Sequence, residues 1–308
     1  MNDHSQAFAD RPDLLTGSET GRTLVVANPI SGTFHRRRLE KMIAQLRAKG
    51  VAVDLHLTSR AGELRTLAET LPEDVTTLVV AGGDGSLNEA VNGLVRRSGS
   101  PPALAVLPFG TANVLARELK LPFHASPIAR MLRRRRLAPL HLGQIGDRAF
   151  LLMASAGFDG AVVHAVDPAL KQRYGALAYA FAALRLAMAR KGRDVLVDAD
   201  GERIVCRIAV ATTARCYGGP MSITTKTGVT MPGLRLVTLA DDRPLTLLKA
   251  AVMLGLGRLD RLASVGDRPM TEVRMSGQGI AMQIDGDAMD TTDAPIRAHP
   301  RLLSVVVP

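Results

Sequence analysis

Apolar runs alternate with amphipathic helical segments through the first part of the chain, and this alternation constrains the fold more than any other feature. Leu39, Met42, Ile43 and Leu46, for example, have the i, i+3, i+4 and i+7 spacing of a helix. Strand signals lie at 23–27, 51–57, 77–80 and 104–107, and helical segments at 39–46, 62–70, 86–97 and 112–119. Such alternation predicts a parallel sheet covered by helices, and ligands of these sheets bind beyond the carboxyl ends of the strands.

The pattern changes after the four consecutive arginines at 133–136. Strand signals now follow one another, at 137–142, 149–154, 194–199, 203–211 and 234–239. Further on, residues 271–275 and 282–285 alternate between apolar and polar residues, which is the period of an antiparallel strand. Helical segments interrupt the strands at 175–190 and 244–255. We therefore predict an α/β fold, with an N-terminal parallel-sheet domain and a C-terminal β-rich, sandwich-like domain.

The composition limits the partners and the compartment of the protein. The chain has 308 residues, of which 46% are hydrophobic, enough for two domains with substantial cores. Its formal net charge of +10 favours anionic partners such as nucleotides or an acidic membrane surface. Aromatic residues make up only 3%, so we expect no nucleic-acid partner. Cys206 and Cys216 lie in apolar segments, are interpreted as core residues, and indicate a reducing compartment.

From the sequence we expect neither a membrane-spanning segment nor a signal peptide. The longest apolar segment, 175–189, is interrupted by Arg185 and is too short to span a bilayer. The first twenty residues are polar and lack the basic start and apolar stretch of a signal peptide. We therefore expect residues 1–20 to be a disordered tail and the protein to be cytoplasmic.

Three turns of small residues end strands of the predicted parallel sheet. They lie at 28–32 (Asn-Pro-Ile-Ser-Gly), 82–85 (Gly-Gly-Asp-Gly) and 108–113 (Pro-Phe-Gly-Thr-Ala-Asn). Glycines let backbone N–H groups approach phosphate oxygens, and the start of a helix adds positive potential, so the turns together suit a nucleotide. Each turn alone also fits a structural role. After the turn at 82–85, for example, Ser86 and Glu89 form a capping-box pattern. None is a Walker A loop, since no Gly-Lys-Ser/Thr follows.

Residues 82–94 closely resemble the signature of the diacylglycerol kinase catalytic-domain family, which includes bacterial lipid kinases and sphingosine kinases. Residues 28–32 are similar to the nucleotide loop of that family, and residues 107–122 are similar to its third motif. A less specific similarity at the start of the second domain comprises 156–159, Lys171, Gly175 and Tyr179. The resemblance covers residues 22–308.

The resemblance implies a division of the chain into two domains. An ATP-binding α/β domain would comprise residues 21–136 together with 299–308, and a β-rich lipid-substrate domain would comprise residues 137–298. The final strand, 304–307, would return to the first domain. The active site would lie in the cleft between the domains.

The resemblance also implies roles for individual residues. Asp285 corresponds to a proposed general base, and Asp84 would position the acceptor hydroxyl or a metal, although which of the two is the base stays open. Asp287, with Asp84, would serve the metal, Asp287 acting indirectly. The nucleotide-binding residues would be Asn28, Ser31, Gly32, Thr58, Gly82, Gly83, Gly85, Asn88, Glu89, Gly110, Thr111 and Asn113.

The sequence departs from the family pattern in three places. Asp287 replaces a Glu, which shortens its reach to a metal by one methylene, a gap that a bridging water could fill. Ser86 replaces a Thr and keeps the hydroxyl. Residues 226–227 and 231–233 replace the element of an extra structural Mg²⁺ site, so we predict that this site is absent.

The sequence therefore predicts a kinase that uses ATP and Mg²⁺ to phosphorylate a lipid alcohol, such as diacylglycerol or a related lipid. NAD kinases are an alternative because they also use a Gly-Gly-Asp-Gly turn. Here, however, Asn88 and Glu89 follow that turn directly, and residues 108–113 fit lipid kinases better. The Asp at 287 leaves a third hypothesis, a non-catalytic nucleotide- or lipid-binding homologue. No oligomeric state is predicted.

Three basic clusters fit either solvated faces or a docking surface for an anionic bilayer. They comprise 36–38, 133–136, and Arg190, Lys191 and Arg193. Each basic residue near such a bilayer contributes about 1 kcal/mol, so four arginines would give roughly millimolar binding. The second interpretation predicts transient, peripheral association with the inner face of the membrane.

Overall fold

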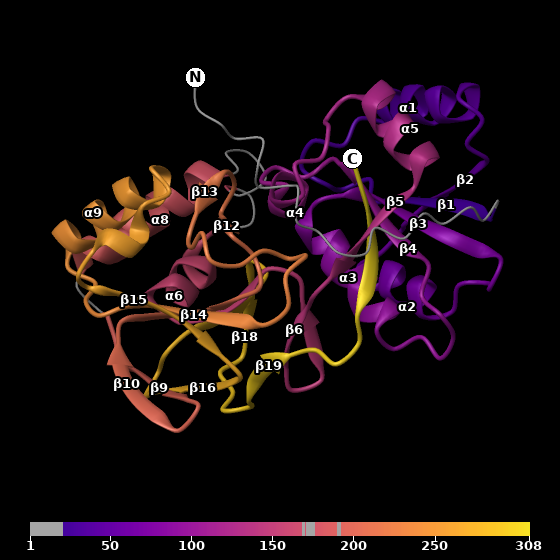
Figure 1. The fold of residues 1–308 in the computed structure, drawn as a ribbon. Helices are drawn as coiled ribbons and strands as arrows, with labels where there is room; N and C mark the ends of the chain where they lie inside the picture. Colours follow the sequence, from indigo (N-terminus) through magenta and orange to yellow (C-terminus); the bar gives the residue numbers. More distant parts are fainter. Residues whose placement is uncertain (1–20, 168–169, 171–175, 190–191) are drawn as a thin grey trace, which may run out of the picture.

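The computed structural model describes residues 21–167, 170, 176–189 and 192–308, and the predicted tail at 1–20 lies outside them. Figure 1 shows two lobes side by side, with the N-terminal lobe on the right and the C-terminal lobe on the left. The first lobe contains a six-stranded sheet, and the second contains two six-stranded sheets. This architecture confirms the predicted α/β domain followed by a β-rich sandwich.

The sheet of the first lobe has the strand order β2-β1-β3-β4-β20-β5. Its strands are β1 (Arg22–Ala27), β2 (Val53–Leu57), β3 (Val75–Gly82), β4 (Ala103–Pro108), β5 (Arg136–Leu140) and β20 (Leu303–Val307). All neighbours pair in parallel except β5, which is antiparallel to β20. Strand β3 is central and almost wholly buried, because both of its faces are covered, and this accounts for its unbroken apolar run.

Helices cover both faces of this sheet (Figure 1). Helix α1 (Arg36–Ala48) packs beside α5 (Ala125–Arg134) on one face, and α2 (Glu63–Glu69) packs beside α3 (Asp84–Leu94) on the other. The four apolar residues predicted to form the inner face of α1 are all buried, as expected. The short helix α4 (Val114–Glu118) lies next to the second lobe, where it contacts a small hairpin.

The second lobe is a sandwich of two mainly antiparallel sheets around its own apolar core. One sheet has the order β10-β9-β16-β19-β6-β7, and the other has the order β15-β14-β11-β8-β17-β18. The first comprises β6 (Gly143–Ile145), β7 (Arg148–Phe150), β9 (Val195–Ala199), β10 (Glu202–Cys206), β16 (Glu272–Ser276) and β19 (Ile296–Ala298). The second comprises β8 (Met153–Gly157), β11 (Ile208–Thr212), β14 (Leu234–Leu239), β15 (Val265–Met270), β17 (Met282–Ile284) and β18 (Asp287–Met289).

Helices α6 (Phe158–Ala165), α8 (Ala176–Ala189) and α9 (Pro244–Gly255) gather on the outer side of the β8-containing sheet (Figure 1). A hairpin of β12 (Cys216–Tyr217) and β13 (Met221–Ser222) and the 3₁₀ turn η2 (Leu259–Arg261) lie near them. These elements build a helical layer above the sandwich, and the layer faces α4 of the first lobe through β12.

Three expectations about strands were wrong. The apolar run at 149–154 falls on two strands, β7 and β8, which belong to opposite sheets of the sandwich. Residues 137–140, assigned to the second domain, form β5 of the first sheet, because β5 pairs along its full length with the returning strand β20. The apolar run at 203–211 is not one strand but two, β10 and β11, which belong to opposite sheets of the sandwich. The chain changes sheets at Arg207, whose guanidinium is held by Gly192 O and Asp194. The returning strand itself is confirmed, one residue longer than predicted.

The two cysteines are core residues, as expected. Cys206 and Cys216 are buried free thiols, and burial raises the pKa of Cys206 to about 11 and that of Cys216 to about 12. Among the described residues, no helix is both long enough and apolar enough to span a bilayer.

Candidate active site

The three turns predicted to bind a nucleotide lie against one another at the carboxyl edge of the first sheet. Asn28 Nδ2 donates to Ser86 Oγ at 3.2 Å, and Thr33 donates its N–H to Phe109 O at 2.9 Å, so the first turn contacts both others. A Cβ on Gly32 would lie 2.6 Å from Thr111 Oγ1. These contacts bring the strand ends of β1, β3 and β4 into one site.

Gly83 and Gly110 allow the second and third turns to approach closely. A Cβ built on Gly83 would lie 3.0 Å from the Gly110 Cα, and one built on Gly110 would lie 2.5 Å from the Gly83 Cα. Any side chain at either position would therefore push the two turns apart. Asn113 fixes the third turn, because its side chain accepts from Gly110 N–H at 2.8 Å and donates to Gly110 O at 2.6 Å.

Asp84 is the first residue of α3 and also holds the start of α4. Its Oδ2 accepts the N–H of Val114 at 3.0 Å, and its Oδ1 accepts the N–H of Leu115 at 3.1 Å. Burial raises the pKa of this carboxyl, and the two N–H donors oppose the change. The two carboxylate oxygens together have about four acceptor positions, so these two bonds leave acceptor capacity on Asp84, which lines the cavity.

Asp285 is placed by the sandwich and is bonded far more heavily. The residue has a left-handed backbone (φ 49°) directly after β17. Its Oδ1 accepts the N–H groups of Leu152 and Met153 at 2.8 and 3.0 Å. Its Oδ2 accepts from Leu151 N–H and from Asn88 Nδ2, both at 2.7 Å. These four donors occupy the acceptor capacity of the carboxylate, and the Asn88 bond joins α3 of the first domain to the second domain.

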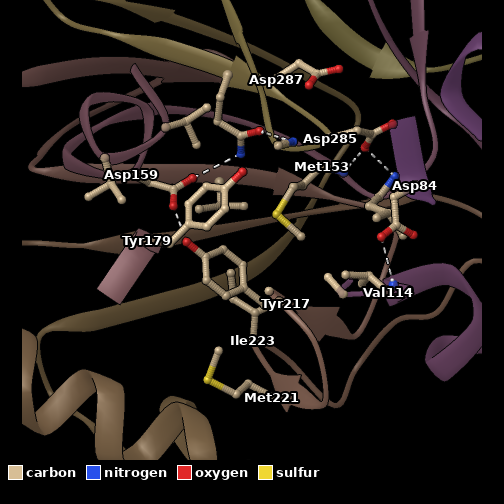
Figure 2. A pocket seen from close by; sticks show the side chains of 18 of the residues that line it. Asp84, Val114, Met153, Asp159, Tyr179, Tyr217, Met221, Ile223, Asp285 and Asp287 are labelled. Atoms are coloured by element: carbon tan, nitrogen blue, oxygen red, sulfur yellow. Dashed lines mark hydrogen bonds between the residues drawn. The ribbon is translucent and has the colours of Figure 1, made fainter. Parts of the chain in front are cut away.

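One cavity of about 1490 Å³ contacts both domains and both carboxylates. Figure 2 shows Asp84 and Asp285 on one side of it and Asp159 with Tyr217 on the other, with the Met153 side chain between. The predicted site residues that line it are Asn28, Ser31, Gly32, Gly83, Asp84, Gly85, Asn88, Glu89, Gly110, Thr111, Asp285 and Asp287. Thr58, Gly82 and Asn113 do not line it: Thr58 bonds to Ala27 O, Gly82 pairs within the sheet, and Asn113 shapes its own turn.

Comparison with known proteins places this two-domain arrangement in a family. Residues 22–145 match the model of the diacylglycerol kinase catalytic domain, and residues 153–307, half of the chain, match that of the YegS C-terminal NAD kinase beta sandwich-like domain. The chain belongs to the diacylglycerol kinase family. The resemblance of residues 82–94 to that family's signature is thereby confirmed.

Two relatives in this family align with the chain over different lengths. A diacylglycerol kinase of Staphylococcus saprophyticus is 27% identical over 183 residues, which are 59% of the chain and 60% of that relative. The alignment thus spans less than two thirds of that protein. A probable lipid kinase YegS-like of Pseudomonas savastanoi is 29% identical over 276 residues, 86% of the chain and 87% of the relative.

The crystal structure of a diacylglycerol kinase from Bacillus anthracis has the same fold, with a TM-score of 0.76 and 18% identity. The match covers 94% of this chain and 97% of that one. The two-domain architecture is therefore shared across nearly the whole length of both proteins.

The part of the cavity that lies in the second domain contains a polar cluster that the sequence did not reveal. The buried Asp159 carboxylate accepts from Gln283 Nε2 at 3.0 Å, from Ser155 Oγ and from the Tyr217 hydroxyl. Burial and the Asp159 charge raise the pKa of Tyr217 well above its usual value. Only Asp159 had a signal, as part of the 156–159 motif, whereas Gln283 was expected on a polar strand face and is buried by these bonds.

Beyond this cluster the cavity is apolar. Its lining there comes from the inner sides of α6, α8 and α9 and from β11 and β14, as with Val162, Ala183, Val210, Val237 and Leu247. The cavity thus has a polar end with N–H-rich turns and carboxylates, and a long apolar end.

Proposed function

We propose that this chain transfers the γ-phosphoryl group of ATP to the hydroxyl of a lipid alcohol. The observation that supports it most is the single cavity that runs from the three glycine-rich turns, past Asp84 and Asp285, into an apolar chamber of the second domain. A phosphate-binding end and a hydrocarbon-binding end in one cavity fit a reaction between a nucleotide and a lipid. The names of the relatives, diacylglycerol kinase and probable lipid kinase, agree with this substrate class.

ATP would bind through backbone groups at the carboxyl edge of the first sheet. The N–H groups of the turns and the start of α3, an eleven-residue helix, supply partial positive charge for phosphate oxygens. In this proposal Asn28, Ser31, Gly32, Gly83, Gly85, Gly110 and Thr111 meet the phosphates, Asn88 and Glu89 line the same end, and Thr58, Gly82 and Asn113 support the turns.

The donor set fits a Mg²⁺ ion that is held mainly by the nucleotide. Among the described residues, no three His, Cys, Asp or Glu side chains cluster as a metal cage. Asp287 lines the cavity and is exposed, and its carboxylate makes no hydrogen bond or ion pair to the described residues, so the carboxylate is available. Kinase-bound Mg²⁺ commonly takes one or two carboxylates with phosphates and waters. When bound, the ion would neutralise charge on the phosphates.

The two buried carboxylates have different roles in this proposal. The open acceptor positions of Asp84 make it the group that takes the proton of the acceptor hydroxyl as the oxygen attacks the γ-phosphorus and ADP departs. Asp285 has its acceptor positions occupied by four N–H donors, so we assign it a positioning role. It holds Asn88 and the 151–153 backbone together across the domain boundary.

The proposal is tested by incubating the protein with γ-labelled ATP and a total lipid extract, followed by identification of the labelled lipid. Transfer of label to a lipid with a free hydroxyl is the expected result. The same reaction with NAD tests the alternative raised by the NAD kinase-like name of the second domain's model. Label in NADP with none in lipid, or ATP binding without any product, would refute the lipid kinase proposal.

Transfer from ATP to a lipid alcohol also implies a location. We propose that the enzyme is cytoplasmic, where ATP is available, and that it associates peripherally with the inner face of the membrane that contains its acceptor. Of the three basic clusters predicted to serve this association, Arg190 and Lys191 lie outside the described residues.

A further inference from the structure

Helices α8 and α9 expose an unusual amount of apolar side chain to solvent. Eight large hydrophobic residues on them are 55% to 70% exposed, and no residue of α9 is buried. We call these eight residues the α8–α9 ridge; they are Leu177, Phe181, Leu184 and Met188 on α8, Leu245, Leu248 and Val252 on α9, and Leu256, which caps the end of α9. Single exposed hydrophobic residues are ordinary on protein surfaces, but a contiguous set marks an interaction site.

The ridge occupies one face of each helix. Its α8 residues recur at i, i+4, i+7 and i+11, and its α9 residues at i, i+3, i+7 and i+11, so on each helix they form one stripe. The two helices contact each other at the end of the second lobe that lies away from the first lobe (Figure 1). The ridge therefore consists of one apolar stripe on each of two helices that contact each other at the periphery of the molecule.

The opposite sides of the same helices line the apolar end of the cavity, for example Ala183 and Leu247. Leu184, Met188 and Leu248 belong to both sets, since they are exposed on the ridge and also line the cavity. The rim of the cavity thus lies on the ridge. A molecule with a hydrocarbon chain could pass between the two without crossing polar surface.

The charge around the ridge fits an anionic surface. Helices α8 and α9 contain no Asp or Glu, and Arg185, Lys249 and the nearby Arg258 are all exposed. Three acidic residues flank α9: Asp242 pairs with Arg207, while Asp241 and Asp260 lie in sequence beside Arg243 and Arg261. In each arginine cluster of the first domain, one residue is engaged within the domain, while Arg36, Arg37, Arg133, Arg134 and Arg136 are exposed. The Arg38 guanidinium stacks over the Phe109 ring and bonds to Phe123 O, and Arg135 bonds to Thr76 O.

We propose that the α8–α9 ridge inserts into the outer layer of an anionic lipid bilayer and that a lipid acceptor enters the cavity between these two helices. Helices that lie in an interface bury their apolar side about 5–10 Å into it, while neighbouring basic residues meet anionic headgroups. The entry route rests on the proposed lipid kinase function, whereas bilayer insertion by the ridge is independent of it.

Tryptophan reporters test insertion directly, because the chain has no Trp of its own. Phe181→Trp places the reporter on the ridge. Leu196→Trp is the matched control, since Leu196 is also exposed, at 50%, but lies on β9 in the other sheet of the sandwich. With phosphatidylglycerol vesicles, the emission of the Phe181→Trp protein should shift to shorter wavelength and be quenched by brominated lipid. Equal responses of the two proteins, or no response of the ridge reporter, would overturn the proposal.

Vesicle sedimentation gives a second measurement. The substitutions Leu177→Gln, Phe181→Gln, Leu245→Gln and Leu256→Gln lie on the ridge but outside the cavity lining, and together should reduce binding to phosphatidylglycerol vesicles at least tenfold. The control Leu196→Gln with Val205→Gln removes an exposed cross-strand pair from β9 and β10 and should bind like the unmodified protein. Undiminished binding by the ridge variant would contradict the proposal.

Three further outcomes separate bilayer insertion from dimerisation and from the proposed kinase activity. If the unmodified chain is a dimer in solution and the ridge variant is a monomer, a second copy covers the ridge and bilayer insertion is refuted. If the ridge variant loses vesicle binding but phosphorylates acceptor dispersed in detergent micelles at the normal rate, docking and chemistry are separate, as proposed. Vesicle binding by the ridge in a protein that phosphorylates no lipid would refute the proposed function and leave the docking surface standing.

Discussion

At the scale of single residues, the number of N–H donors on each buried carboxylate separates their roles. Asp84 accepts two backbone N–H groups and Asp285 accepts three, plus the Asn88 amide. Asp84→Asn should reduce kcat by about 10²–10⁴-fold, the usual contribution of a general base. Asp285→Asn should instead act mainly on stability: it should lower the free energy of unfolding by about 1–3 kcal/mol, because an NH₂ group would then face N–H donors.

Denaturant unfolding and steady-state kinetics on both variants check this assignment. Circular dichroism spectra that match the unmodified protein are the control for folding. The assignment fails if Asp84→Asn retains near-normal kcat, or if Asp84→Asn is the more destabilised of the two.

The raised pKa of Asp84 has a consequence for the pH dependence of the reaction. Only the ionised carboxylate can accept a proton, and burial moves the pKa of Asp84 above its usual value of 3.8. The kcat of the unmodified enzyme should therefore rise with pH through that raised pKa. In Asp84→Asn the residual kcat should lack this acid limb. A limb that persists unchanged in the variant would assign the titration to another group.

Glu63, at the start of α2, makes a stability contribution that depends on pH. Its Oε2 accepts from the backbone N–H and the hydroxyl of Ser59, both at 2.7 Å, and its Oε1 lies 2.7 Å from His56 Nε2. The Ser59 donors, with His56, lower the pKa of Glu63 from 4.5 to about 2. A lowered folded-state pKa stabilises the protein above the unfolded-state value, and the contribution is lost as pH falls toward 2.

Glu63→Gln should therefore be less stable than the unmodified protein at neutral pH, and the difference should shrink as pH falls below 4.5. Urea unfolding of both proteins at several pH values measures it. Glu69→Gln, an exposed residue at the other end of the same helix, is the control and should show a smaller pH-dependent difference. A difference that grows on acidification would contradict the predicted sign.

At the scale of elements, α4 connects the end of the cavity formed by the three turns to its apolar end, where we propose that the nucleotide and the lipid bind. Asp84 holds the amino end of α4, and Glu118 is its last residue. The Glu118 side chain is only 2% exposed, and its Oε2 accepts the N–H groups of Arg215 and Cys216 at 3.1 and 2.7 Å. Those residues begin the segment that places Tyr217 against Asp159.

Glu118→Ala should loosen β12 and disturb the lipid end of the cavity more than the nucleotide end. We expect the KM for a lipid acceptor to rise more than the KM for ATP, with a stability loss of about 1–3 kcal/mol for the unsatisfied N–H groups. Glu118→Gln is the matched control, because its amide oxygen can still accept both bonds. Equal changes in both KM values would show that Glu118 does not link α4 specifically to the apolar end of the cavity.

How far elements could be predicted depends on whether their signal is local. Helix α9 was predicted with its observed bounds, since its capping proline and apolar spacing lie within its own sequence. Strand β5 was assigned to the wrong domain because an apolar run does not identify its partner, which here is β20 at the far end of the chain. For the same reason, β10 and β11 looked like one strand although they pair in different sheets.

The site residues likewise divide into those with a local sequence signal and those without one. The turns with Ser31, Gly83 and Thr111 follow strands of one parallel sheet, so their proximity followed from topology. Tyr217 and Glu118 had no such signal, because each gains its importance from a contact made only in the folded chain. The ridge residues were visible as parts of two helical segments, but their exposure is a property of the folded chain, in which no described element buries them.

At the scale of the whole molecule, the chain returns to complete the sheet on which its first domain depends. Strand β20 lies between β4 and β5, and Val305 and Val306 are fully buried. Without β20, the inner edges of β4 and β5 would lose their hydrogen-bond partners and expose the first domain's core. A fragment of residues 21–140 should therefore fail to unfold cooperatively or to bind ATP.

The register of the sheet offers a direct rescue. Leu140, the end of β5, pairs antiparallel with Leu303, the start of β20, so a two-residue turn can join them. Residues 21–140 followed by Asn-Gly and residues 303–308 should form a β-hairpin there, because Asn-Gly favours the turn that two-residue hairpins need. This protein should unfold cooperatively and bind ATP by calorimetry. The same fusion with Val305→Asp is the control of equal length and should do neither, because it buries an unpaired charge. If the fragment without β20 already folds and binds ATP, the first domain does not need its returning strand.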